Sequence, residues 1–177
     1  MSVIKRVNEL YNAGDVKRLH TVNTLQTQTV GQHVYGSQII AVELLNRAIE
    51  EGIEVRAVAV LIALLLHDAP EVVTGDIPAP TKRAMPGLNA ELDKMEFDFY
   101  EKLNIEVPEL TKAEADIVKS ADVLDLMMTC VRERRLGNRH PRLAEVMRNV
   151  ATYLNEQIHV AGVVELRAEL WEAWVEA

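Results

Sequence analysis

Residues 61–76 read LIALLLHDAPEVVTGD, and this stretch decides how the chain folds. It begins inside a run of ten apolar residues, Ala57–Leu66, which is too short to span a bilayer and is typical of a buried core helix. Pro70 cannot continue a regular helix, so we expect the helix to end or kink near Asp68. Four ionisable residues follow the apolar run within ten positions, and such groups are costly to bury. The stretch therefore predicts a core helix whose polar end belongs to a metal site or a catalytic site.

The rest of the chain supplies helices that could surround this one. Capping boxes at Thr29–Gln32 and Thr111–Glu114 each predict the start of a long helix. The proline-rich residues 77–80 should be extended and residues 82–87 irregular. No segment alternates as a strand does, and no repeat is present. We predict a single all-α domain over residues 1–177, a bundle of about six or seven helices, with helical periodicity over residues 2–12, 30–50, 55–67, 90–103, 111–136, 141–157 and 161–176.

Charge and cysteine content narrow the class of protein. A formal net charge of −8 argues against a surface that coats nucleic acid. The single Cys130 excludes an intramolecular disulfide and fits a reducing compartment. The first residues lack the apolar core of a signal peptide. We expect a soluble cytoplasmic protein with neither a nucleic acid nor a membrane as its partner.

The side chains at the end of the apolar stretch have the chemistry of a metal site. His67 and Asp68 are adjacent, and Glu71 can lie on the same side of a helical turn. His33 falls in the first turn of the helix over residues 30–50, where partial positive charge favours the neutral imidazole that binds metals. Asp122 lies beside the apolar stripe of the long helix over residues 111–136.

Two imidazoles and two carboxylates suit a divalent ion such as Zn²⁺, Mn²⁺ or Co²⁺, and Mg²⁺ is a further candidate for the bound metal. With free coordination positions, such an ion makes a water molecule more acidic and polarises a phosphoryl oxygen. Glu71 is close enough in sequence to orient or deprotonate that water. The pattern thus favours metal-dependent hydrolysis of a phosphate compound.

The order and spacing of these residues resemble a known family. His33, then His67-Asp68, then Asp122 are similar to the H…HD…D signature of the HD-domain metal-dependent phosphohydrolases. The segment HDAPEVVTGD resembles the HD-x-x-E-x-x-x-x-D variant of the YfbR-type 5′-deoxynucleotidases, and TGDIPAPTK resembles the segment that follows it there. Arg18, fifteen residues before His33, matches the phosphate-binding arginine of that subgroup.

The resemblance implies a role for each matching residue. It makes Glu71 the residue that assists the attacking water, Arg18 a phosphate ligand, and Asp76 a neighbour of the sugar or the leaving group. It also implies a nucleotide substrate and a homo-oligomer, either a dimer or a hexamer. The implied metal ligands are His33, His67, Asp68 and Asp122.

One position departs from the subgroup. Bacterial YfbR-type enzymes have Trp after the phosphate-binding arginine, where it helps to exclude a ribose 2′-hydroxyl, whereas this chain has Leu19. His20 could take over that contact. The short chain is also similar to phage enzymes of the DatZ type, which remove triphosphate from dATP. Lys82 and Arg83 could contact a longer phosphate chain, or they could be exposed cations that serve only solubility. A phage protein of this kind would work in the host cytoplasm.

We therefore predict hydrolysis of deoxynucleotide phosphates, with a dNTP (dATP) triphosphohydrolase as the first reading and a 5′-deoxynucleotidase acting on dNMPs as the alternative. Hydrolysis of a guanosine tetraphosphate-type alarmone ranks below both, as does a non-enzymatic helical adaptor that has kept the HD fold. Several polar residues are expected on solvated faces instead: Asp125, the run Arg132–Arg135, His140 and His159. For Asp125 the alternative is a position directly behind the metal ligands, because it follows Asp122 by three residues.

Overall fold

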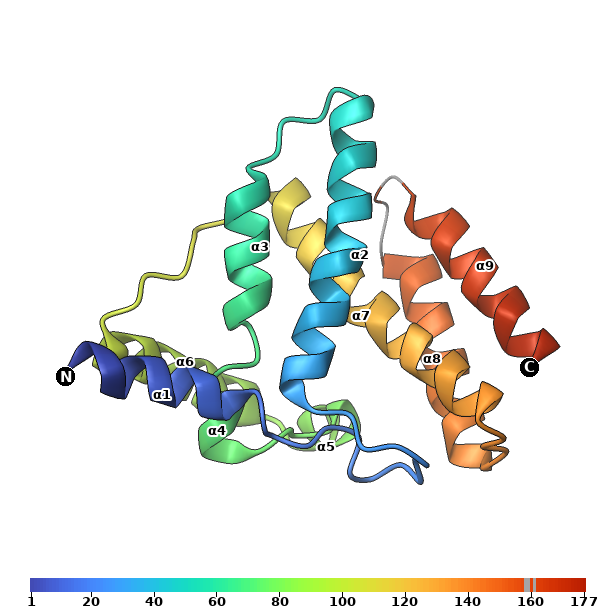
Figure 1. Cartoon of the computed structure of the whole chain (residues 1–177), viewed down its shortest axis with the longest axis horizontal. Coiled ribbons are helices and arrows are strands. Elements are labelled where there is room, and N and C mark those ends of the chain that lie inside the picture. The colour runs from blue at the N-terminus through green and yellow to red at the C-terminus, as the bar shows by residue number, and fades with distance from the viewer. Residues whose placement is uncertain (158–159, 161) are drawn as a thin grey trace.

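The computed structural model describes residues 1–157, 160 and 162–177, so the expected surface position of His159 lies outside the described residues. Within these ranges the chain forms nine helices and no strand, which confirms the all-α prediction (Figure 1). The helices are α1 (Val3–Ala13), α2 (Val30–Glu50), α3 (Ala57–Leu66), α4 (Glu71–Thr74), α5 (Ala79–Ala84), α6 (Leu88–Leu103), α7 (Lys112–Arg135), α8 (Pro141–Gln157) and α9 (Val163–Glu176).

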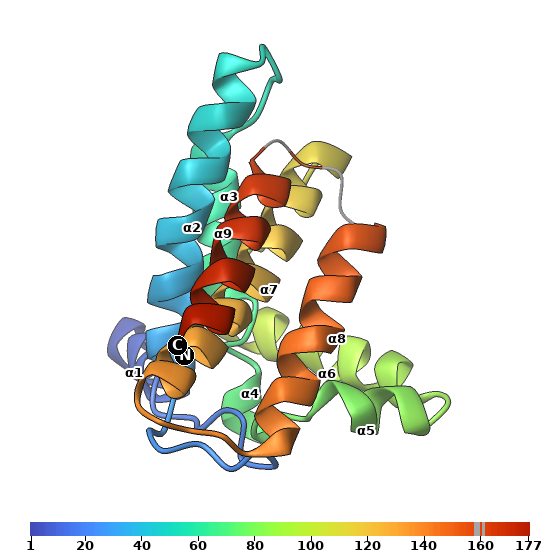
Figure 2. The ribbon, with the colours of Figure 1, turned by 90° about the vertical axis from the view of Figure 1, so that its right-hand side faces the viewer.

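Helix α7 is the centre of the main core. It packs against α2, α3, α8 and α9, and Figure 2 shows α8 and α9 covering it on the side away from α3. Leu44, Leu64 and Leu124 come from three different helices and are all fully buried in this core. Both predicted capping boxes are present, because Thr29 and Thr111 each accept a hydrogen bond from the backbone three residues later. The two longest helices therefore begin at defined positions on a common core.

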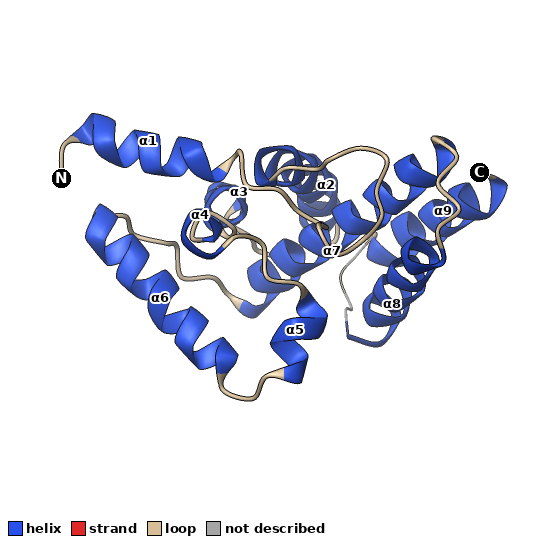
Figure 3. Cartoon of the chain, turned by 90° about the horizontal axis from the view of Figure 1, so that it is seen from below, coloured by secondary structure: helices blue, strands red, loops and turns tan. Residues whose placement is uncertain are grey.

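A second, smaller cluster holds the other end of the molecule together. Ala13 of α1, Ala69 after α3, and Phe99 and Leu103 of α6 are buried in it. Tyr100 of α6 donates its hydroxyl hydrogen to the carbonyl of Leu66, where α3 ends. Figure 3 shows α1, α4 and α6 together on one side of the molecule, away from α8 and α9. The polar end of α3 therefore lies between a large core and a small one.

The number of helices differs from the prediction because two short helices, α4 and α5, are additional. The expected extended path over residues 77–80 and the irregular segment over residues 82–87 are wrong where α5 forms. Pro80 falls in the first turn of α5, where a missing backbone N–H costs nothing. The prolines therefore start this helix instead of preventing it.

One apolar window, Ala57–Thr74, is long and apolar enough to cross a membrane by composition, and 39% of it is buried. The helix does not continue through this window, because α3 ends at Leu66 after ten residues. At about 1.5 Å per residue, ten residues reach only half of a hydrocarbon core of about 30 Å. Helix α3 instead packs against α2 and α7, as a core helix does.

Candidate metal centre

Three helices deliver the proposed ligands to one place. The last turn of α3 is followed directly by His67 and Asp68, where the chain turns towards α4. His33 lies in the first turn of α2, and its side chain is fully buried. Asp122 projects from the middle of α7 and is partly buried. Residues far apart in sequence thus meet at one end of the main core.

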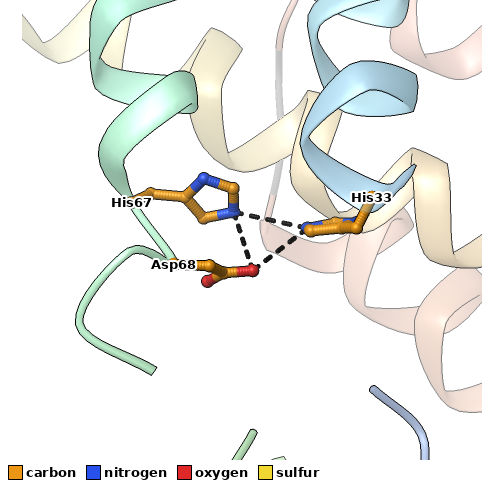
Figure 4. Close-up of side chains that lie close together, drawn as sticks. All are labelled: His33, His67 and Asp68. Atoms are coloured by element: carbon orange, nitrogen blue, oxygen red, sulfur yellow. Dashed lines mark hydrogen bonds and ion pairs between the residues drawn. The ribbon is translucent and has the colours of Figure 1, made fainter. Parts of the chain in front are cut away.

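Three ligand atoms form a nearly equilateral triangle (Figure 4). The Nε2 atoms of His33 and His67 are 3.3 Å apart, and Oδ2 of Asp68 lies 3.5 Å from the first and 3.3 Å from the second. Tetrahedral zinc bonds of about 2.0–2.1 Å place neighbouring ligand atoms about 3.3–3.4 Å apart. These three atoms could therefore hold one metal ion with no change in their spacing.

Asp122 adjoins this triangle. Its Oδ1 lies 3.2 Å from Nε2 of His33, and its Oδ2 accepts a hydrogen bond of 2.7 Å from the ammonium of Lys119. Burial raises the pKa of the Asp122 carboxyl, but the hydrogen bond from His33 and the charges of Lys119 and His67 outweigh it and hold the pKa far below its usual range. Asp122 is therefore ionised and adjacent to the position that a metal would take.

Carboxylates lie at both nitrogens of the His33 ring. Burial lowers the pKa of His33, but hydrogen bonds with Asp122 and Asp125 raise it to about 9. These carboxylates therefore favour a protonated ring as long as no metal ion is bound at Nε2, and the neutral, metal-binding form stays a prediction. A metal ion bound at Nε2 would take the place of a proton there.

Arg18 and Glu71 lie beside the triangle. The guanidinium of Arg18 forms an ion pair with Oδ2 of Asp68, and its Nη1 lies 4.0 Å from Oε2 of Glu71. That oxygen is buried and accepts no hydrogen bond from any residue that the structure describes. Burial, together with the charge of Asp68, raises the pKa of Glu71 to about 7. A carboxyl group with a free oxygen and this pKa is suited to move a proton near neutral pH.

Asp125 is not on a solvated face, contrary to the sequence-based expectation. It is only 5% exposed, and its Oδ2 lies 2.7 Å from Nδ1 of His33, on the side of the ring that faces away from the triangle. Its spacing of three residues from Asp122 is a sequence signal for an inward position, because residues three apart lie close together on one helix surface. Only the packing of α7 on α2 shows that Asp125 faces inwards.

The segment that carries Arg18 is fixed at its base. Lys17 and Thr29 form an isolated antiparallel bridge, and the Arg18 N–H donates to the carbonyl of Gln28 at 2.9 Å. Leu19 has a positive φ of 56°, which is uncommon for a residue with a side chain, and its N–H donates to Oδ2 of Asp76 at 3.0 Å. In this structure Asp76 thus holds the backbone of the segment.

The tip of the same segment is fixed by a residue that was expected on a solvated face. Glu133 is 3% exposed and accepts hydrogen bonds from the N–H groups of Leu25 and Gln26, at 2.6 and 2.8 Å. Asn138 donates to Glu133 as well, at 2.8 Å. The loop over residues 19–28 is therefore attached at both its base and its tip.

A small cavity opens next to the triangle on the side of α4–α6. It has a volume of about 40 Å³, which is near that of one water molecule, and His67, Asp68, Glu71 and Lys82 are among its lining residues. The exposed imidazole of His20 lies outside the cavity, with its Nδ1 4.0 Å from Asp76. The structure thus places Lys82 near the triangle and His20 at its outer edge.

Comparison with known proteins gives the same family as the resemblance stated from sequence. The model of the family described as "5′-deoxynucleotidase YfbR-like" matches residues 7–164. The 5′-deoxynucleotidase yfbR of Photorhabdus temperata is 29% identical over 147 residues, which cover 73% of this chain and 74% of that protein. A dATP triphosphohydrolase of Salmonella phage PMBT28 is 37% identical over 93 residues, which cover 50% of this chain and 47% of that protein.

A solved structure shares the fold. The HD phosphohydrolase DatZ of cyanophage S-2L, bound to dA and one catalytic Zn²⁺ ion, aligns with a TM-score of 0.65 and 18% identity, covering 96% of this chain and 94% of that one. Because the family model covers most of the chain, the resemblance stated from sequence is confirmed. The chain belongs to the YfbR-like 5′-deoxynucleotidase family and is a hydrolase.

Proposed function

We propose that the chain is a metal-dependent 5′-deoxynucleotidase, which hydrolyses a deoxynucleoside monophosphate to a deoxynucleoside and inorganic phosphate. The observation that carries this proposal is the triangle of His33, His67 and Asp68, with Asp122 at its edge and Arg18 and Glu71 on its open side. Hydrolysis of a phosphate ester needs positive charge beside the anionic phosphate and a base that takes a proton from the attacking water. This arrangement supplies both. The monophosphate reading was the alternative at the level of sequence, and the names of most relatives favour it.

The metal would be held by the four predicted ligands, His33, His67, Asp68 and Asp122. A divalent ion supplies charge for a phosphate oxygen and acidifies a water molecule. Glu71 would take the proton from the attacking water, because it lines the small cavity and its Oε2 accepts no hydrogen bond from the residues that the structure describes. Arg18 would turn from Asp68 to the phosphate, since its guanidinium is already in the site.

The substrate-side residues follow from the same geometry. Leu19 and His20 would line the sugar or the base, because they follow Arg18 directly on the anchored loop. Asp76 would act there by holding the Leu19 backbone, with its carboxylate close to His20. Leu19 offers a smaller surface than the Trp of bacterial relatives, so we expect weaker discrimination against ribonucleotides.

A second candidate is a dATP triphosphohydrolase, and a specific observation favours it. Two lysines beyond Arg18 lie close to the site: Lys82 lines the small cavity, and Lys119 binds the outer oxygen of Asp122. A longer phosphate chain carries more negative charge and would engage more cations than a monophosphate does. The named phage relative shows that this activity occurs among similar chains.

Product analysis separates the candidates. Purified protein would be incubated with dNMP, dNDP and dNTP substrates and their ribonucleotide counterparts, each with Mn²⁺, Co²⁺, Zn²⁺ or Mg²⁺. Release of phosphate from dNMPs supports the first proposal, and release of intact triphosphate from dNTPs supports the second. No turnover with any metal, from protein that also binds none, would favour the helical adaptor. The ratio of deoxyribonucleotide to ribonucleotide turnover measures the effect of Leu19.

We further propose a homo-oligomer in the cytoplasm. Apolar side chains remain exposed along α3, where Val58 is 70% and Leu65 is 56% exposed, and along α1, where Val3 is 66% exposed. Such residues are typical of surfaces that meet a partner. Light scattering coupled to size-exclusion chromatography tests the oligomer, and a monomer at micromolar concentration would contradict it.

A further inference from the structure

The hidden side of the His33 ring is occupied by a carboxylate. His33 presents Nε2 to the triangle of ligand atoms, while its Nδ1 lies 2.7 Å from Oδ2 of Asp125. An ionised carboxylate can only accept a hydrogen bond, so Nδ1 must keep its proton in this contact. The nitrogen left to bind a metal is therefore Nε2, which is the one that faces the triangle.

Asp125 is itself held in place by a side chain from the anchored loop. Nε2 of Gln28 donates to Oδ2 of Asp125 at 3.0 Å and to the hydroxyl of Thr129 at 2.8 Å. The backbone carbonyl of the same glutamine accepts the N–H of Arg18. Gln28 thus connects two parts of the site, because its side chain orients the carboxylate behind His33 and its backbone holds the segment of Arg18.

Gly36 provides the room that Asp125 needs. It lies inside α2, one turn after His33, and a Cβ atom built on it would be 2.0 Å from Oδ1 of Asp125. Glycine within a helix is destabilising relative to alanine, so its presence at this position calls for a compensating reason. The reason that the structure gives is steric, because any side chain here would push the carboxylate away from the ring.

We propose that Asp125 is a positioning residue for the metal ligand His33, with Gln28 orienting the carboxylate and Gly36 leaving space for it. Asp125 fixes the ring orientation and keeps the proton on Nδ1, so that Nε2 is presented to the metal. Carboxylates that act in this way behind a histidine ligand typically change metal affinity by about 10–100-fold. The inference rests on the metal site of the proposed function and adds residues that the ligand signature does not contain.

Zinc affinity tests the inference directly. We would measure the dissociation constant of zinc by competition with a chromophoric chelator at a fixed pH, for the wild type, Asp125→Ala, Asp125→Asn and Gln28→Ala. We expect zinc binding to weaken by about 10–100-fold in Asp125→Ala. The loss should be smaller in Asp125→Asn, whose amide oxygen can accept the Nδ1 proton but carries no charge. Asp116→Ala, a change of a half-buried aspartate that pairs with Lys112 on the same helix, is the matched control and should bind zinc as the wild type does.

A spectroscopic readout separates positioning from a general loss of structure. In the zinc-loaded wild type, ¹⁵N chemical shifts of His33 should show a protonated Nδ1 that exchanges slowly with solvent. In Asp125→Ala that proton should exchange quickly or be lost. If Asp125→Ala does not fold, Asp125→Asn and Gly36→Ala replace it, and Gly36→Ala must weaken zinc binding although every polar group is still present.

The two proposals fail in different ways. A wild type that binds no zinc and turns over no nucleotide contradicts the proposed function itself. A wild type that binds zinc, together with folded Asp125 variants of the same affinity and the same Nδ1 exchange, contradicts only the role of Asp125.

Discussion

The site has one side built by α2 and α7 and another built by α4, α5, α6 and the loop over residues 19–28. The first side lies on the main core and carries His33, Asp122 and Asp125. On the second side, α4 and α6 pack in a much smaller apolar cluster, and the loop is held by hydrogen bonds to Glu133. This side carries Glu71 and Lys82. Metal-ligand geometry tolerates little movement, whereas substrate contacts can vary. The proposed metal ligands of the first side accordingly lie on the large core, and the proposed substrate contacts lie on the side with less apolar packing.

The largest expected effect comes from removing a ligand shared by both sides. Asp68→Ala should lower turnover by more than about 10³-fold, because it removes a proposed metal ligand and the shorter of the two ion pairs of the Arg18 guanidinium. Steady-state kinetics and metal analysis check this. Asp98→Ala, an exposed change on α6, is the control. Near-normal activity of Asp68→Ala would show that the metal lies elsewhere.

The next effect should separate chemistry from metal binding. Glu71→Gln should reduce kcat by about 10²–10⁴-fold, because the amide cannot accept a proton from water, while zinc affinity stays close to that of the wild type. The exposed Glu91→Gln serves for comparison. If zinc affinity falls as much as kcat does, then Glu71 supports the ligands and does not handle the water.

A smaller effect should fall on substrate binding alone. Lys82→Ala should raise KM by about tenfold with little change in kcat, because the lysine lines the cavity without touching the ligand triangle. Arg83→Ala, at the exposed next position, is a matched loss of one positive charge and should have no such effect. A larger rise in KM for triphosphates than for monophosphates would favour the second candidate activity.

The smallest effect on catalysis should come from a change in the support of α7. Hydrogen bonds from Arg56 and Thr111 hold the pKa of the buried Glu114 far below its ordinary value of 4.5. A lowered pKa stabilises the fold above the ordinary pKa, and this contribution is lost as the pH falls through the lower one. Glu114→Gln should therefore reduce Tm at pH 7, and the difference from wild type should shrink in strong acid.

Thermal unfolding at several pH values checks this prediction, with the exposed Glu109→Gln as the control. Turnover per folded molecule should be unchanged, since Glu114 caps the start of α7, far along the helix from Asp122. A loss of activity without a loss of stability would contradict this separation of roles.

The sequence predicted the proposed metal ligands better than their surroundings. The apolar run before His67 and the capping box before His33 are local signals. The end of α3 and the start of α2 could therefore be placed without a structure. The spacing of His33, His67-Asp68 and Asp122 then identified the family, and the family model confirms that assignment.

The residues that the sequence misplaced depend on contacts between distant segments. Asp125 and Glu133 look like ordinary charged positions on α7, and only the docking of α2 and of the loop over residues 19–28 shows what they bind. Helix α5 was missed for a local reason, since its prolines lie in the first turn, where a helix tolerates them.

The ion pair between Arg18 and Asp68 bears on how the protein would behave when metal is scarce. Small zinc domains unfold without their ion, because the free energy of metal binding supplies their free energy of folding. Here the Arg18 guanidinium already pairs with Asp68, and the long helices pack on an extensive apolar core. Loss of the ion should thus leave an intact, dormant protein that regains activity on resupply, so that the supply of metal sets the activity of a constant pool of molecules.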